Sequence, residues 1–295
     1  MTSGVLLVDK PQGVTSHDVV ARTRRAFGTR KVGHAGTLDP MATGLLLIGI
    51  DGATRLLTYL VGLGKTYEAT IRLGESTDSD DADGEITGRA APDAVAALGD
   101  DAIDAGIAQL TGDIEQVPSA VSAIKVDGRR AYDRVRAGEQ VELKARSVTV
   151  SRFERLATRR LDGAVELDVA VDCSSGTYIR ALARDLGAGL GVGGHLTRLR
   201  RTRVGEFDVA DAVSADGLDG AEPMAPADVA ARAVGSIEVT AEQARDLRHG
   251  KRLEGLAHLV PETNAAAVDP SGALVGIVEK RGSALKSAMN MPENA

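Results

Sequence analysis

The spacing of hydrophobic residues along the chain predicts both strands and helices, without a strict alternation of the two. Apolar and polar side chains alternate over residues 67–74 and 165–172, which is the pattern of a half-buried strand. Residues 15–28 and 179–187 carry apolar side chains at helical spacing, and a glycine stands where each helix should end. The pattern favours an α+β fold.

The C-terminal part of the chain differs in composition from the part before it. Residues 211–236 are rich in Ala, Asp, Gly and Pro, and we interpret them as a linker. A short capped helix is expected from residue 240 to the glycine at 250, followed by two strands joined by a turn at 269–272. We therefore predict a larger domain over residues 1–232 and a small β-rich domain over residues 236–291.

The segment GHAGTLDPMATG, residues 33–44, contains a single carboxylate, Asp39, between Leu38 and Pro40. One interpretation is structural: Asp39 would cap a helix that begins at Pro40 and continues into the apolar run that follows. The other is chemical, because glycines on both sides would allow another molecule to approach closely and a rigid Asp–Pro turn would fix the direction of the carboxylate. The segment by itself does not separate these interpretations.

The formal net charge of −7 argues at first against a nucleic-acid partner, but the charges are unevenly distributed. Residues 21–36 contain five basic residues and no acidic one, and residues 195–203 contain four arginines. Residues 75–104 contain ten acidic residues and one arginine. We therefore expect the two basic runs to stand free to meet phosphates.

Several classes of function are not supported by the sequence. No apolar run approaches the roughly 20 residues needed to span a membrane, and the N-terminus does not resemble a signal peptide. The single cysteine, Cys173, fits a reducing cytoplasm. Glycine-rich segments at 62–66 and 189–194, and the acidic segment at 77–85, fail the spacing of nucleotide or calcium loops. The histidines lack metal-ligand spacing, so we expect neither a metal nor a cofactor.

Six segments of the chain together resemble the TruB family of tRNA pseudouridine-55 synthases. In chain order they are LLVDKPQGVTSHDVV, KVGHAGTLDPMATGLLLIGI, GKTYEATIRLGESTDSDDADG, SAIKVDGRRAYDRVRAG, CSSGTYIRALARDLG and GGHLTRLRRTRVGEF. The resemblance covers about residues 4–207, and residues 236–290 are similar to the PUA-like domain that ends many members. It implies the pseudouridine synthase fold, a mixed and mainly antiparallel sheet flanked by helices, with a PUA-like RNA-binding domain at the C-terminus.

The resemblance implies that the protein converts the uridine at position 55 in the T loop of tRNA into pseudouridine. The N-glycosidic bond is broken and the base is rejoined through carbon, without a metal or cofactor. Asp39 matches the nucleophilic aspartate, which favours the chemical interpretation of that segment. Tyr67 matches a tyrosine that stacks on the extruded base, and the resemblance also allows it a role in proton transfer; its place in the alternating strand is also that of a core tyrosine. Arg180 matches the arginine that pairs with the nucleophile and keeps it ionised.

Other matched residues are expected to bind the substrate. His34 matches the histidine that fills the space left in the T loop by the flipped nucleotide. Tyr178 and Leu199 are expected on the wall of the base pocket, although a leucine in that pattern is equally a core residue. The basic runs are expected to grip phosphates of the T arm, with Arg30, Lys31, Arg200 and Arg201 as the named contacts. We expect a cytoplasmic monomer.

Two alternatives remain open at this stage. The protein could bind or fold tRNA with catalysis incidental, or it could be a pseudouridine synthase that depends on a guide RNA and protein partners. One local departure from the family pattern, Ser119 and Val121 where the family more often has Pro and Tyr, makes the shape of that loop uncertain.

Overall fold

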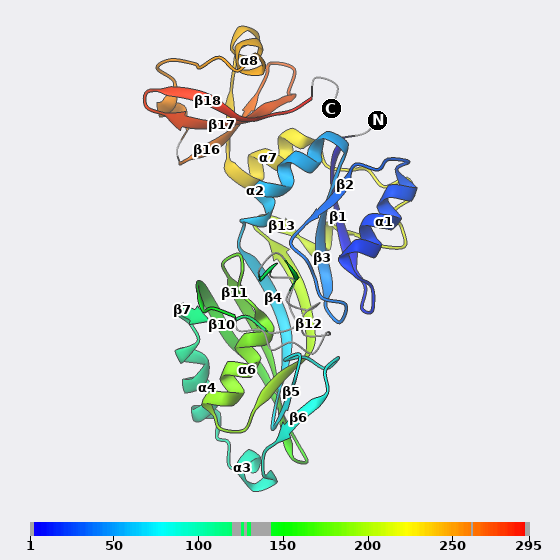
Figure 1. The fold of residues 1–295 in the computed structure, drawn as a ribbon, viewed down its shortest axis with the longest axis vertical. Helices are drawn as coiled ribbons and strands as arrows, with labels where there is room; N and C mark the ends of the chain where they lie inside the picture. The colour runs from blue at the N-terminus through cyan, green and yellow to red at the C-terminus, as the bar shows by residue number, and fades with distance from the viewer. Residues whose placement is uncertain (1–2, 120–124, 127–128, 131–142, 261, 293–295) are drawn as a thin grey trace. The chain divides into compact units, whose positions relative to one another are not determined.

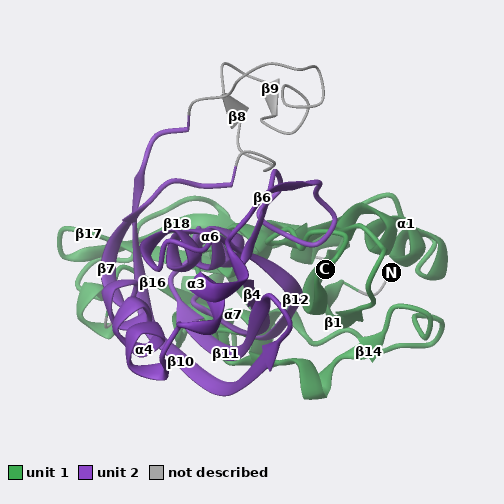
Figure 2. Cartoon of the chain, turned by 90° about the horizontal axis from the view of Figure 1, so that it is seen from below, with its two compact units in different colours: residues 1–63, 203–295 green, residues 64–202 purple. Residues whose placement is uncertain are grey.

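The computed structural model describes residues 3–119, 125–126, 129–130, 143–260 and 262–292. The chain forms two compact units, which are coloured separately in Figure 2. Unit 1 combines residues 1–63 with residues 203–295, and unit 2 consists of residues 64–202. In the described part of the chain, no helix has both the length and the hydropathy needed to cross a membrane.

The elements of unit 1 come from both ends of the chain (Figure 1). Those of the N-terminal segment are β1 (Gly4–Lys10), α1 (Ser16–Ala26), β2 (Val32–Ala35), β3 (Thr43–Ile50), η1 (Asp51–Leu56) and α2 (Leu57–Val61). Those of the C-terminal segment are β13 (Phe207–Asp208), η2 (Val209–Asp211), β14 (Val213–Ser214), α7 (Pro226–Val234), β15 (Ser236–Glu238), α8 (Ala241–Arg248), η3 (Ala257–Leu259), β16 (Asn264–Val268), β17 (Leu274–Arg281) and β18 (Ala284–Asn290).

Strands β1 and β3 form the centre of the first sheet of unit 1 and are buried on both faces. They pair antiparallel, β2 pairs antiparallel with β3, and β14 lies parallel to β1. Alternate side chains such as Leu6 and Ile48 pack against Val19 and Val20 of α1. The opposite face of the same strands belongs to a second buried cluster, so the sheet is covered on both sides.

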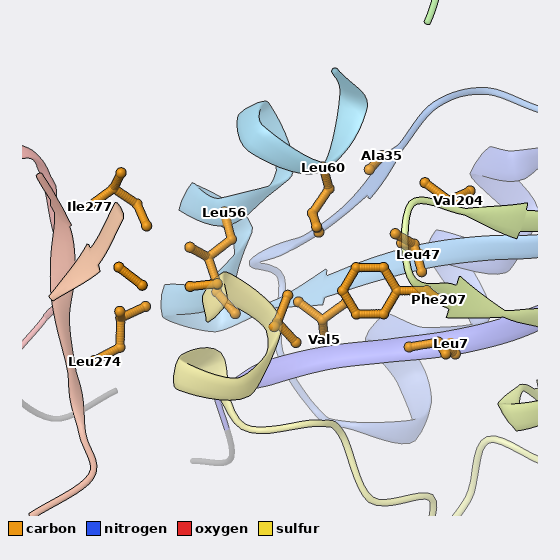
Figure 3. Close-up of a cluster of buried hydrophobic side chains, with 14 of the residues drawn as sticks. Val5, Leu7, Ala35, Leu47, Leu56, Leu60, Val204, Phe207, Leu274 and Ile277 are labelled. Carbon is orange, nitrogen blue, oxygen red and sulfur yellow. The ribbon is translucent and has the colours of Figure 1, made fainter. Parts of the chain in front are cut away.

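The second cluster also joins the C-terminal sheet to the rest of unit 1 (Figure 3). Leu274 and Ile277 of β17 belong to the same buried cluster as Leu56, Val229 of α7 and Phe207. The C-terminal sheet has the strand order β15-β16-β17-β18 and buries a cluster of its own beneath α8. Apolar burial therefore connects the small sheet to α7 and to the first sheet.

Unit 2 is built on a twisted antiparallel sheet with helices packed against it. Its strands β12, β4, β11, β10 and β7 lie in that order, and β11 pairs antiparallel with β4 and β10, as does β10 with β7. Helices α4 and α6 contact each other and the sheet. The elements are β4 (Lys65–Leu73), β5 (Glu75–Thr77), β6 (Ile86–Arg89), α3 (Pro92–Ala96), α4 (Asp100–Gln109), β7 (Gly112–Gln116), β8 (Lys125–Val126), β9 (Arg129–Arg130), β10 (Arg146–Leu161), β11 (Ala164–Cys173), α6 (Ile179–Gly189) and β12 (Gly194–Val204), the last of which crosses the unit boundary.

The structure confirms most elements predicted from local patterns. Both alternating segments are strands, β4 and β11, and both helical segments are helices, α1 and α6. Thr15 caps α1 in a capping box with Asp18, which satisfies backbone N–H groups at the helix start. The turn between β16 and β17 is held by Asp269, whose carboxylate accepts from the backbone N–H groups of Ser271 and Ala273.

The predicted linker over residues 211–236 is wrong as a description of that segment. It contains β14 and the nine-residue helix α7, in which Val229 is fully buried and Ala230 is 1% exposed. Pro226 starts this helix and Gly235, at φ +72°, ends it. Composition alone suggested a loop, because proline and glycine are common at helix ends as well as in loops. The predicted domain boundary at 232–236 stays a prediction.

Helix α6 continues two residues past Gly187, where the sequence pattern predicted its end. A Cβ atom placed on Gly187 would lie 2.2 Å from the backbone carbon of Gly193 and the backbone nitrogen of Gly194. Gly187 is therefore required for a close approach between α6 and the start of β12, and not for helix termination. This contact fixes α6 against the sheet of unit 2.

We predict that Gly187→Ala destabilises the protein by about 1–3 kcal/mol, because backbone atoms of the neighbouring turn must move to accept the methyl group. The matched control is Gly189→Ala in the same helix, where an added Cβ meets nothing within 4 Å. That change is expected to be neutral or stabilising by up to about 1 kcal/mol, since alanine is the better helix former. Urea unfolding measures both; equal effects of the two substitutions would contradict the proposed contact.

Candidate active site

Asp39 is half-buried and lies in a turn between β2 and β3, not at the start of a helix. The backbone N–H of Ala42 donates to the carbonyl of Asp39 at 3.1 Å, and strand β3 begins one residue later. The helix that one interpretation placed after Asp39 is therefore wrong. Strands β1 and β2 pair with β3 on its two edges and satisfy its backbone, and both faces of β3 are buried.

Leu38, the residue before Asp39, is hydrogen-bonded to helix α1. The Ser16 hydroxyl accepts a hydrogen bond from the backbone N–H of Leu38 at 2.9 Å and donates to the carbonyl of Leu38 at 3.1 Å. Ser16 is 1% exposed and Leu38 is 3% exposed, so water does not compete for these groups. The backbone that carries Asp39 is therefore held from one side by the first turn of α1.

The residue after Asp39 is held by the loop that follows β1. The Lys10 ammonium is fully buried and donates to the carbonyls of Val14 at 2.6 Å and Pro40 at 3.4 Å. The backbone N–H of Gly13 donates to the same Pro40 carbonyl at 2.8 Å. Lys10 belongs to the N-terminal motif DKPQG, and here it joins two loops. Asp39 thus sits in a turn whose flanking residues are both fixed.

His34 lies in strand β2, where it pairs with Ile48 of β3 and is half-buried. Its ring makes an edge-to-face contact with the ring of His17, with centroids 5.5 Å apart and an interplanar angle of 82°. His17 lies in the first turn of α1 and was not among the predicted site residues. The local sequence pattern does not predict the contact between His17 and His34, because the two rings meet only where α1 packs on β2.

Tyr67 lies in strand β4 of unit 2 and is 8% exposed. It stands opposite Val171 of β11, and on β4 it shares a face with Ala69 and Ile71, as the alternation predicted. Two residues earlier on that face, burial lowers the pKa of Lys65 to about 8, with the positive charge of Arg201 adding to the effect. This end of β4 is therefore poorly solvated.

Tyr178 is the residue that precedes helix α6, and its backbone is held by Gln116 at the end of β7. The Gln116 amide accepts from the Tyr178 N–H at 2.8 Å and donates to the Tyr178 carbonyl at 3.1 Å. Gln116 is 2% exposed. Gln116 was not among the predicted site residues, because the local pattern does not show that it is buried and that its amide therefore needs partners.

Arg180 is 4% exposed and lies in the first turn of α6. Its Nη1 donates to the carbonyl of Ser79 at 2.8 Å and to Oδ2 of Asp81 at 3.1 Å. Asp81 is 4% exposed, and its other oxygen, Oδ1, accepts from the Ser79 hydroxyl at 2.5 Å and from the Asp83 N–H at 3.1 Å. A buried charge of each sign is therefore paired and hydrogen-bonded, as burial requires.

The loop over residues 77–84, which we call the acidic loop, is the main feature that sequence analysis did not assign. Its spacing does not match that of a calcium loop, and the sequence pattern did not indicate the ion pairs that its carboxylates form. Asp80 pairs with Arg184 of α6 at 3.1 Å, next to the Asp81–Arg180 pair. The one available signal was the presence of two arginines in a helix with an apolar face, because arginines that become buried need acidic partners.

The expectation that both basic runs stand free is wrong for several of their members. Arg22 pairs with Asp216 at 2.6 Å, and Arg198 lies 3.7 Å from Glu68. Arg201 is 1% exposed, so the phosphate contact predicted for it would require its side chain to become exposed. The alternation of β12 turns neighbouring side chains to opposite faces, which a count of charges does not show.

The remaining predicted contacts differ in exposure. Arg30 and Lys31 are exposed on the loop between α1 and β2, and Arg200 is half-buried. Leu199 is 5% exposed, which fits both a residue of the pocket wall and a residue of the core. Within unit 1 the structure contains Asp39 and His34 on consecutive segments; unit 2 contains the predicted residues of β4, α6 and β12. Val121, where the family pattern is interrupted, lies outside the described residues.

Comparison with protein families gives matches along nearly the whole chain. The TruB family pseudouridylate synthase N-terminal domain matches residues 24–179. The tRNA pseudouridylate synthase B C-terminal domain matches residues 180–231, and the C-terminal domain of tRNA pseudouridine synthase II matches residues 235–292. The resemblance seen in the six sequence motifs is therefore confirmed over both the motif-bearing part and the C-terminal part.

Two relatives named tRNA pseudouridine synthase B match at high identity. The protein of Leifsonia xyli subsp. xyli is 59% identical over 292 residues, which is 98% of this chain and 97% of that protein. The protein of Corynebacterium aurimucosum is 55% identical over 287 residues, covering 96% of this chain and 94% of that protein.

Two solved structures share the fold at lower identity. A chain in an H/ACA RNP bound to a substrate RNA containing 2′-deoxyuridine gives a TM-score of 0.69 at 22% identity, over 98% of this chain and 85% of that one. A chain of an archaeal box H/ACA sRNP complex gives 0.69 at 24% identity, over 99% and 87%. The predicted pseudouridine synthase fold, with a mainly antiparallel sheet and a small C-terminal β-sheet, is confirmed. By family match and by identity over almost its full length, the chain belongs to the TruB family of pseudouridylate synthases.

Proposed function

We propose that this protein isomerises the uridine at position 55 in the T loop of tRNA to pseudouridine, acting alone as a cytoplasmic monomer. The observation that carries the proposal is 59% identity, over 98% of the chain, to a protein named tRNA pseudouridine synthase B. The fastened turn around Asp39 supports it, because a nucleophilic carboxylate must be aimed. The motifs that contain Asp39, Tyr67 and Arg180 in this sequence support the same assignment.

In the proposed reaction, Asp39 is the nucleophile and no metal is needed. The bond from the ribose to the base nitrogen breaks, a bond from the ribose to a base carbon forms, and the proton of that carbon is lost while the nitrogen gains one. Substrate and product are isomers, so no oxidant is consumed. Arg180 supplies the cation that favours the ionised form of Asp39, and the acidic loop fixes the direction of its guanidinium.

The uridine has to leave the stack before Asp39 can reach it. We propose that His34 occupies the space it leaves and that Tyr67 stacks on the extruded base. Tyr178 and Leu199 would complete the wall of the pocket. The low exposure of Tyr67 and Leu199, at 8% and 5%, supports a dry pocket in which electrostatic interactions with the reacting groups are strengthened.

Binding of the T arm would rest on phosphate contacts, which position the RNA without reading its sequence. The exposed Arg30 and Lys31 are the simplest candidates for these phosphate contacts. Arg200 is a further candidate, and Arg201 is one only if RNA binding exposes it. The predicted PUA-like domain over residues 236–291 is proposed as a further RNA-binding part of the chain. The net charge of −7 is compatible with this, because many acidic residues are already paired with arginines inside unit 2.

The test is to incubate purified protein with an unmodified tRNA transcript and map the modified position. We expect pseudouridine at position 55 without guide RNA, protein partner or metal. Asp39→Asn is expected to abolish the reaction while tRNA affinity stays within a few-fold, because the substitution removes the nucleophile and keeps the shape. No modification by the wild-type protein would refute the function, and turnover by Asp39→Asn near the wild-type rate would refute the role of Asp39.

We predict that His34→Ala slows modification of a structured T-arm hairpin more than that of an RNA with a destabilised loop. Flipping costs a few kcal/mol, and less when the base is already unstacked. Turnover on the two RNAs is compared, with a melting curve of the variant as control. Equal losses on both RNAs together with a lower melting temperature would mean that His34 only packs within unit 1.

We predict that Arg30→Gln combined with Lys31→Gln weakens tRNA binding and lowers the salt slope of the binding constant by roughly two units, one for each lost phosphate contact. The control is Arg152→Gln, an arginine of β10 that already pairs with Glu154. Binding is measured from low to high salt. If the salt slope of the double variant equals that of the control, Arg30 and Lys31 are exposed to solvent and do not contact phosphates.

A further inference from the structure

Two arginines on one face of α6 grip consecutive residues of the acidic loop. Arg180 and Arg184 are four residues apart, so their side chains leave the helix on the same side. Arg180 binds the carbonyl of Ser79 and the carboxylate of Asp81, as described above. Arg184 binds the residue between them, with Nη1 3.1 Å from Oδ2 of Asp80. The loop is therefore held at three successive positions.

Arg184 also reaches a second segment. Its Nη2 donates to the carbonyl of Val117 at 2.7 Å, immediately after Gln116, whose amide holds both backbone groups of Tyr178. One guanidinium thus connects the acidic loop and the segment that follows β7 to helix α6, which carries Arg180 and begins directly after Tyr178. Each of these contacts lies within unit 2.

Asp80 is the residue of the loop that most needs such support. Its backbone has φ +61°, in the left-handed region that residues other than glycine adopt at a cost. It is 8% exposed, and its carbonyl accepts from the backbone N–H of Leu196 at 3.0 Å. Burial raises the pKa of its carboxyl, whereas the neighbouring Ser119, Arg184 and Arg180 favour the ionised form. Without Arg184, the carboxylate would lose an ion-pair partner in a poorly solvated position.

We propose that Arg184 is a positioning residue for the reaction: by holding Asp80 and the Val117 carbonyl, it fixes the acidic loop in the conformation that aims Arg180. The proposal rests on the proposed function of this chain. It assigns to Arg184 no contact with the RNA or with the reacting atoms.

The contacts of Arg184 favour this role over direct RNA binding. Its side chain is 29% exposed, yet its Nε, Nη1 and Nη2 all donate within the protein, to Asp185, Asp80 and Val117 respectively. A phosphate would have to displace an internal acceptor. Loss of the side chain should therefore change the rate of the chemical step and leave the binding of tRNA nearly as it was.

The experiment measures the single-turnover rate of pseudouridine formation with enzyme in excess, and the dissociation constant for tRNA, in the full-length protein. For Arg184→Met we expect the rate to fall by roughly 10- to 100-fold, the range that a small misplacement of a catalytic group can cost. The dissociation constant should change by less than about two-fold, well under the roughly ten-fold that 1.4 kcal/mol represents. Arg184→Lys should recover part of the rate, because it restores the charge beside Asp80.

The matched control is Arg155→Met. Arg155 also pairs with two aspartates of unit 2, Asp104 at 2.7 Å and Asp100 at 3.2 Å, but lies on β10 and contacts neither the acidic loop nor α6 in these pairs. Its loss should lower the melting temperature comparably and leave the rate unchanged. A rate loss in Arg184→Met no larger than in this control would overturn the proposal.

Asp80→Asn provides a second, milder test, since asparagine also tolerates the left-handed conformation. It should slow the reaction, and its combination with Arg184→Met should cost less than the product of the two separate losses, because both act on one contact. Multiplicative losses, or a loss that lies wholly in tRNA affinity, would overturn the proposal. If the wild-type protein itself forms no pseudouridine, the proposed function fails; if it does and Arg184→Met matches it, only the positioning role fails.

Discussion

The arrangement of unit 2 depends on the burial of a guanidinium. Arg180 is 4% exposed, and a buried charge without partners would cost several kcal/mol. The cost is offset by a carboxylate, Asp81, and a carbonyl, both supplied by one loop. Because guanidinium hydrogen bonds are directional, the loop that neutralises the charge also fixes the orientation of the side chain. Charge burial and positioning are thus a single interaction.

In unit 1 the corresponding constraint is the fixing of the short turn that connects β2 to β3. The turn of Asp39 contains too few residues to hold itself by regular secondary structure. Its neighbours Leu38 and Pro40 are instead bound by a buried serine and a buried lysine, which come from α1 and β1. These elements are themselves fixed by the apolar clusters on both faces of β1 and β3. The turn is therefore rigid because the elements that hold it are packed into the hydrophobic core.

The distribution of charge reconciles an acidic protein with an anionic substrate. Many carboxylates of residues 75–104 face arginines of other elements, as in the pairs of Arg155, Arg180 and Arg184. The two charges of such a pair sum to zero, so the pair produces only a weak electric field in the solvent. Exposed cations such as Arg30 and Lys31 can then interact with phosphates at short range, within the Debye length.

The sequence by itself determined the features that depend on near neighbours along the chain. The capping box at Thr15 and Asp18, the alternation of β4 and β11, and the turn at Asp269 each satisfy backbone groups within a few residues. The motifs around Asp39, Tyr67 and Arg180 were likewise sufficient to indicate the family. They did so because each motif is a continuous stretch of chain. The roles of these three residues stay predictions.

Only the tertiary structure decided which groups meet across the chain. The run after Asp39 is a strand because β1 and β2 flank it, and α7 is a helix because the core of unit 1 receives its apolar side. Asp81 lies 99 residues from Arg180, and Gln116 lies 62 residues from Tyr178, so no local pattern pairs them. Burial of a charge becomes costly only when the fold has removed the water around it, and that cost selects its partner.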